Sequence, residues 1–163
     1  MQKKDRPYIY SISMTTRKPR PGERDGKDYW FVSPEEFQQH IEQGDLVEYE
    51  KVHDHFYGTP KKPLQKWIAE GRIVLMDLDV FGAMEIKKLF PKNSLLIFLK
   101  PPNVEVLKER LSKRATEGSE ELARRLARVD TELKYADKFD EIVINDDLDK
   151  TVKKVDKLIF GGT

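Results

Sequence analysis

The chain has 163 residues, with 30 basic and 29 acidic side chains, no cysteine and three scattered histidines. This length fits one compact domain, and the near-zero net charge provides no global field toward nucleic acid or an anionic membrane. The lack of cysteine excludes disulfides and Cys-based zinc sites, and no stretch approaches the roughly 18 apolar residues of a membrane span. We therefore expect a soluble, cytoplasmic protein without a bound structural metal.

The first part of the chain has short β-type runs separated by turns. The predicted elements are a strand over 8–14, a polar loop over 15–28, a short strand over 29–32, a helix from the capping sequence Ser33-Pro34-Glu35-Glu36 to about Gly44, an alternating strand over 46–53, and a turn or strand end over 56–59. This pattern favours a small antiparallel sheet.

The second part alternates apolar runs with helical periodicity. Its predicted elements are helices over 62–70, 80–89, 104–113, 119–136 and 148–160, and buried strands over 73–78, 95–99 and 141–144. Such an alternation is typical of a parallel α/β sheet. The sequence thus predicts an α/β fold, with a small antiparallel insert in its first part that suits substrate binding.

The loop between the first strands carries Arg17 and Arg20 on backbone that Pro19 keeps extended. Two converging guanidiniums are well suited to grip a phosphate bidentately. An isolated Arg-x-x-Arg is more often a solvated basic turn. Nucleic-acid binding by the basic loop over 17–27 is disfavoured by the neutral overall charge and the interleaved acidic residues.

Five segments occur in an order and spacing that resemble the guanylate kinase family, whose members transfer a phosphoryl group from ATP to GMP. They are Ser-x-Ser-x-Thr-Thr-Arg-x-Pro-Arg-x-Gly-Glu over 11–23, Asp-Gly-Lys-Asp-Tyr-Trp-Phe-Val over 25–32, Tyr-Gly-Thr over 57–59, Leu-Met-Asp-Leu-Asp over 75–79, and Val-Ile-Asn-Asp-Asp-Leu-Asp over 143–149.

The resemblance implies a P-loop nucleoside monophosphate kinase-like parallel sheet flanked by helices, with a mixed or antiparallel GMP-binding insert and a helical lid. It predicts a single domain over 1–163, divided into a GMP-binding part over about 11–60, a core over 61–110 and 126–163, and a lid over 111–125.

The resemblance also assigns a site for GMP, with dGMP as a second candidate ligand. The phosphate would be held by Arg17, Arg20, Tyr29 and Tyr57, and the guanine read by Glu48 with Ser13 and Thr59, while Glu23, Asp77 and Asp79 complete the substrate-binding set. Taken alone, Glu48 fits a solvent-facing charge on an alternating strand, and the two tyrosines fit half-buried sheet aromatics.

For catalysis the resemblance implies Arg17 together with Arg110, Arg114 and Arg125, the last three delivering positive charge from the lid to the transferring phosphoryl group. Arg110, Arg114 and Asn145 would contact ATP, and Asp79 would contact Mg²⁺ through water. An ordinary charged helix face also explains arginines in this region, and we assign Arg124 and Arg128 to such a face.

One family segment is not found in the sequence: the Gly-x-x-x-x-Gly-Lys-Ser/Thr loop that cradles ATP phosphates. We expect this loop and the first core strand to precede residue 1, so that the chain is an N-terminally truncated form with impaired ATP binding. Either residues outside this sequence or strand exchange in a homodimer would supply the strand. The alternative is a non-catalytic guanylate kinase-like scaffold or GMP-binding module, although a scaffold has no need for so full a nucleotide site.

Overall fold

A computed structural model of the chain describes residues 8–52, 54–114 and 118–161. These residues belong to two compact units, Met1–Lys88 and Leu89–Thr163, which are described separately. In the described ranges no helix combines the length and the apolar character that crossing a bilayer requires. The division into a GMP-binding part, a core and a lid within one domain stays a prediction.

The first unit contains a mixed four-stranded sheet in the order β3-β2-β5-β4. Its strands are β2 (Met14–Thr15), β3 (Trp30–Phe31), β4 (Leu46–Val52) and β5 (His55–Pro60). β2 pairs parallel with β3 and antiparallel with β5, and β4 pairs antiparallel with β5. The small mixed sheet is as expected, but residues 56–59, expected as a turn or strand end, lie within the inner strand β5.

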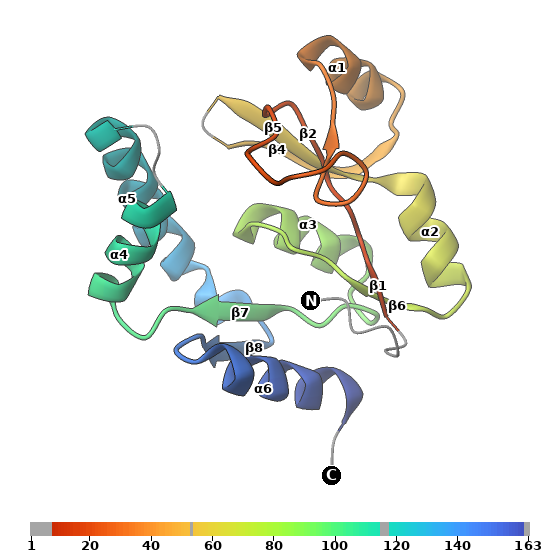
Figure 1. Cartoon of the computed structure of the whole chain (residues 1–163). Coiled ribbons are helices and arrows are strands. Elements are labelled where there is room, and N and C mark those ends of the chain that lie inside the picture. The colour runs from red at the N-terminus through yellow and green to blue at the C-terminus, as the bar shows by residue number, and fades with distance from the viewer. Residues whose placement is uncertain (1–7, 53, 115–117, 162–163) are drawn as a thin grey trace. The chain divides into compact units, whose positions relative to one another are not determined.

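Helix α1 (Pro34–Glu42) packs against this sheet (Figure 1). The Ser33 hydroxyl accepts a hydrogen bond from the Glu36 amide, which confirms the predicted N-cap. Phe37 is fully buried, and its ring stacks on that of Phe56 in β5 at a centroid distance of 5.4 Å. A Cβ on Gly58 would stand 3.0 Å from the Phe37 ring, so the glycine lets helix and sheet approach closely.

A second sheet of the first unit consists of β1 (Tyr8–Tyr10) and β6 (Ile73–Leu75), which pair in parallel. Helix α2 (Lys61–Ala69) leads into β6, and α3 (Val80–Leu89) follows it. The strand expected over 8–14 is therefore divided. Its first residues pair with β6, and the chain then crosses to the mixed sheet as β2.

The second unit is an α/β arrangement built on a parallel pair of strands. Its elements are β7 (Ile97–Lys100), α4 (Val104–Arg114), α5 (Gly118–Lys134), a 3₁₀ turn (Ala136–Lys138), β8 (Glu141–Ile144) and α6 (Leu148–Phe160). Val143 in β8 is fully buried, and α6 runs beside this strand (Figure 1). The Asp147 carboxylate caps α6 by accepting from the Lys150 amide.

The parallel sheet expected from the sequence is observed as two separate strand pairs. Among the described residues, parallel core pairing is limited to β1 with β6 and β7 with β8, in separate units. In this part of the chain neither β6 nor β7 has a second strand along its other edge. The prediction of an additional central strand stays a prediction.

Candidate functional site

The loop that follows β2 is anchored by two threonine hydroxyls. Thr15 is fully buried and donates through Oγ1 to the Phe56 carbonyl at 2.9 Å, while the Thr16 hydroxyl accepts from the Phe56 amide at 2.9 Å. The same Thr15 oxygen accepts from the Arg17 amide. The hydroxyls of the Thr-Thr-Arg segment thus fix the position of Arg17 beside β5.

The Arg17 side chain is nearly buried and makes four hydrogen bonds. Nη1 and Nη2 each donate to the Glu23 carboxylate at 2.9 Å. Nη1 also donates to the Lys18 carbonyl at 2.8 Å, and Nε donates to the Tyr57 hydroxyl at 3.3 Å. Burial lowers the pKa of Arg17, but the bonds to Glu23 and Tyr57 outweigh it and leave the pKa raised. The guanidinium is a fixed positive charge.

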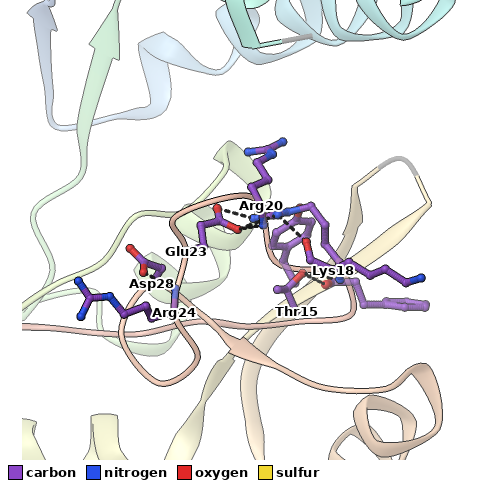
Figure 2. Close-up of polar contacts among 9 residues, drawn as sticks. Thr15, Lys18, Arg20, Glu23, Arg24 and Asp28 are labelled. Carbon is purple, nitrogen blue, oxygen red and sulfur yellow. Dashed lines mark hydrogen bonds and ion pairs between the residues drawn. The ribbon is translucent and has the colours of Figure 1, made fainter. Parts of the chain in front are cut away.

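This arrangement changes the expected phosphate grip. Because Glu23 fills the fork of Arg17, these contacts leave one N–H of the guanidinium for another acceptor, instead of the bidentate pair expected from the sequence. Glu23 also accepts from the Arg20 amide at 2.7 Å, and the exposed Arg20 side chain extends away from that carboxylate (Figure 2). The two arginines share Glu23 but do not converge.

Tyr29 is placed by the turn before it. Gly26 has φ +69° and donates through its amide to the Tyr29 carbonyl at 2.9 Å. A Cβ on Gly26 would meet the Trp30 ring at 2.9 Å, so the turn requires glycine for its backbone and for its space. Tyr29 then lies edge-on to Tyr57 at 5.9 Å and beneath the Arg17 guanidinium at 5.4 Å. Arg17, Tyr29 and Tyr57 therefore form one cluster.

Burial and the Asp77 carboxylate together raise the pKa of two tyrosines in this region. Burial raises the pKa of Tyr29, and the Asp77 carboxylate raises it further. The same two causes raise the pKa of Tyr10, which ends β1, to about 12. Both phenols are therefore neutral hydrogen-bond donors near neutral pH. Sequence reasoning missed Tyr10, although its place at the carboxyl end of a strand is where α/β sheets bind ligands.

A second cluster forms around Glu48. Its Oε1 accepts from the hydroxyl of the fully buried Thr59 at 2.5 Å. Burial raises the pKa of Glu48, the bond from Thr59 lowers it, and the nearby Asp79 raises it, with a net increase. Glu48 is thus not a solvent-facing charge. Ser13, the third residue expected to face guanine, is half-buried, and its carbonyl accepts from the Trp30 amide at 2.9 Å.

Asp79 has a structural function that sequence reasoning did not assign. It directly precedes α3, and its Oδ1 accepts from the Gly82 amide at 2.8 Å, which is the geometry of a helix N-cap. An Asp immediately before an apolar-periodic run is a sequence signal for this cap. Asp77 lies two residues earlier and is exposed.

Two of the residues expected to contact ATP lie together in the second unit. Arg110 in α4 donates through Nη1 to the Asn145 carbonyl at 2.9 Å. The Asn145 amide donates to the Lys100 carbonyl at 2.7 Å, so this asparagine is fixed at the end of β8. The side chains of Arg114 and Arg125 lie outside the described part of the structure, and so do residues 115–117 of the expected lid over 111–125.

The described residues contain no group of three or more His, Cys, Asp or Glu side chains that could bind a metal ion. Mg²⁺ often binds through one or two carboxylates, waters and substrate phosphates, so this finding is compatible with an ion that arrives with ATP. The expected contact of Asp79 with Mg²⁺ through water stays a prediction. The sequence contains no Gly-x-x-x-x-Gly-Lys-Ser/Thr loop, so the residues present do not include that cradle for the ATP phosphates.

Comparisons with known proteins identify the family of the chain. The family model of guanylate kinase matches residues 1–161. The chain belongs to the guanylate kinase family. The guanylate kinase of Caldanaerobacter subterraneus subsp. tengcongensis is 44% identical over 157 residues, which are 96% of this chain and 76% of that protein. That of Gloeobacter violaceus is 46% identical over 155 residues, covering 94% and 75%.

A solved guanylate kinase structure, from Anaplasma phagocytophilum, superposes with a TM-score of 0.83 at 30% sequence identity. The match covers 94% of this chain and 75% of that one. The family of the chain is therefore established, and its fold is similar to that of a solved member. The two side-chain clusters of the first unit can now be interpreted against phosphoryl transfer from ATP to GMP.

Proposed function

We propose that the first unit of this guanylate kinase binds GMP, with the monophosphate at the Arg17 cluster and the guanine at Glu48. The observation that carries this proposal is the pair of pre-formed clusters: a guanidinium fixed by Glu23 and Tyr57, and a half-buried carboxylate fixed by Thr59. Neither cluster needs to be assembled when ligand arrives, which reduces the ordering cost of binding.

The phosphate would meet one strong fixed charge and several neutral donors. Arg17 offers its remaining N–H and its positive charge, and the Tyr29 and Tyr57 hydroxyls add donors. Arg20 is exposed and can swing toward a dianion, adding a second charge-assisted contact. Glu23 acts in this proposal as a positioning residue that holds Arg17, and it contacts substrate only through that arginine.

Guanine recognition would rest on Glu48. Its carboxylate can accept from the N1–H and the exocyclic amine of guanine, while Ser13 and Thr59 supply hydroxyls to the rest of the base edge. Adenine lacks this donor pair, and its binding would take the half-buried Glu48 carboxylate out of water without compensating hydrogen bonds. The same recognition serves dGMP, because the groups assigned to the base and the phosphate do not require a 2′-hydroxyl.

In the transfer step a GMP phosphate oxygen attacks the γ-phosphorus of ATP, the bond to the β–γ bridging oxygen breaks, and ADP leaves. No side chain needs to act as a nucleophile. We assign Arg17, Arg110, Arg114 and Arg125 to stabilising the transferring charge, Arg110, Arg114 and Asn145 to holding ATP, and Asp77 and Asp79 to the substrate side. Mg²⁺, when bound with ATP, neutralises phosphate charge.

The missing phosphate cradle leads us to propose that these 163 residues alone bind GMP well and ATP poorly. A coupled assay of ADP formation from ATP and GMP tests this, run on the chain and on a version extended by a P-loop segment, with GMP binding measured by equilibrium dialysis. We expect both to bind GMP and only the extended version to turn over at the ordinary kinase rate, about 1–100 per second. Turnover at that rate by the 163 residues contradicts impaired ATP binding, and absent GMP binding contradicts the proposed site.

A further inference from the structure

Gly82 occupies a helical position where glycine has no backbone advantage. It is the third residue of α3, its φ lies outside the left-handed region, and its amide is already bonded to the Asp79 cap. Alanine is a better helix former than glycine at such a position. The reason for glycine must therefore lie in the space above its Cα.

That space is filled by the Glu48 carboxylate. A Cβ built on Gly82 would stand 2.8 Å from Oε2 of Glu48, 3.3 Å from its Cδ and 3.4 Å from Oδ1 of Asp79. A contact of 2.8 Å is shorter than carbon and oxygen allow, so the carboxylate would have to move. Its other oxygen is bonded to Thr59 at 2.5 Å, so a retreat of the carboxylate strains or breaks that bond.

Such a movement has different consequences for folding and for recognition. The clashing atoms are the end of one side chain, so the helix and the sheet need not shift. The same movement displaces the acceptor pair that the proposed site presents to the guanine N1–H and 2-amino group. A side chain at this position should therefore weaken recognition of the base without destabilising the fold.

We propose that Gly82 is a specificity-determining residue, whose missing side chain reserves the place of the Glu48 carboxylate and so sets the preference for guanine. This inference rests on the proposed function. It concerns the first turn of α3, which touches the base only through Glu48. The phosphate cluster around Arg17 has no contact with Gly82 among those described, so phosphate binding should be unchanged by a side chain there.

Calorimetric titration with GMP and IMP tests this proposal on the chain as it is. Hypoxanthine keeps N1–H but lacks the 2-amino group, so the ratio of the two dissociation constants measures the guanine contact. We expect the unaltered chain to prefer GMP, and Gly82→Ala to reduce that preference at least tenfold, because IMP has only the N1–H contact to lose and GMP also loses the contact of its 2-amino group.

Two further variants separate recognition from structure. Glu48→Asp shortens the side chain and makes room for a Cβ at position 82. The double variant with Gly82→Ala and Glu48→Asp should therefore lose less of the GMP preference than the sum of the losses in the two single variants. Glu85→Ala alters the exposed side of the same helix and should keep the full preference. Circular dichroism and the urea midpoint should show that Gly82→Ala folds at least as stably as the parent.

The outcomes distinguish a failure of the proposed GMP site from a failure of the role proposed for Gly82. An unaltered chain that binds GMP and IMP equally overturns the proposed function and this inference with it. A preference for GMP that is present in the unaltered chain and survives in Gly82→Ala overturns the inference alone. An equal loss of preference in Glu85→Ala also overturns it, because the effect would then belong to the helix and not to the contact with Glu48.

Discussion

Replacing Arg17 by lysine tests the phosphate cluster most sharply, because it keeps the charge and removes the fork. The guanidinium uses four of its five N–H groups on Glu23, Lys18 and Tyr57, and one remains for phosphate. An ammonium has three N–H groups on a single centre. It cannot hold Glu23, reach Tyr57 and meet the phosphate together.

The GMP complex therefore loses at least one charge-assisted hydrogen bond, which contributes about 1.5–3 kcal/mol to the binding free energy. That corresponds to a roughly 10- to 150-fold higher dissociation constant for GMP. Calorimetry with GMP and with guanosine separates the phosphate from the base, and only GMP affinity should fall. Arg24→Lys is the matched control, because its side chain lies on the other side of the same loop, away from Glu23 (Figure 2). Unchanged GMP affinity, or an equal loss for guanosine, would refute the reasoning.

Three further predictions concern other parts of the first unit. Glu48→Gln replaces an acceptor by a donor and should weaken GMP binding roughly 10- to 150-fold without weakening AMP binding, as measured by equilibrium dialysis. Phe37→Ala removes a fully buried ring stacked on Phe56 and should lower the free energy of unfolding by about 3–5 kcal/mol in urea. A loss below about 1 kcal/mol would contradict that packing. Hydrogen bonding to Arg17 lowers the pKa of Glu23, so its contribution to stability is present above the ordinary carboxyl pKa and is lost as pH falls through the lowered value. The melting temperature of Glu23→Gln should accordingly lie below that of the parent at pH 7, and a gap that does not narrow toward pH 3 would be evidence against the pairing.

Local signals in the sequence were sufficient for most helices. The ranges predicted for α3 and α6 agree with the structure, and the start of α1 follows from Ser33 and Pro34. These elements depend on periodicity and on caps within one segment, so their determinants lie close together in the chain.

The sheets were harder to predict because their partners are distant in sequence. Nothing within residues 8–14 shows that Tyr10 pairs with Leu75 while Met14 pairs with Gly58. Residues 56–59 were expected as a turn or strand end, whereas the structure places them within strand β5. Gly58 is there because Phe37 approaches it, which only the tertiary structure reveals.

The members of the candidate site were easier to predict than the contacts between them. The family motifs point to Arg17 and Glu48, but no motif shows that Glu23 fills the arginine fork or that Gly82 borders the carboxylate. Two local signals were available: the Asp79 cap before an apolar helix, and a glycine inside that helix, which commonly has a packing or functional reason.

The central claim is that the first unit is a pre-formed, guanine-selective GMP site, and one calorimetric comparison tests it directly. The chain is titrated with GMP and then, under the same conditions, with AMP. We predict one GMP bound per chain and at least about a hundredfold weaker binding of AMP, because adenine cannot satisfy Glu48. A folded chain that binds neither nucleotide, or that binds both with equal affinity, would contradict the claim.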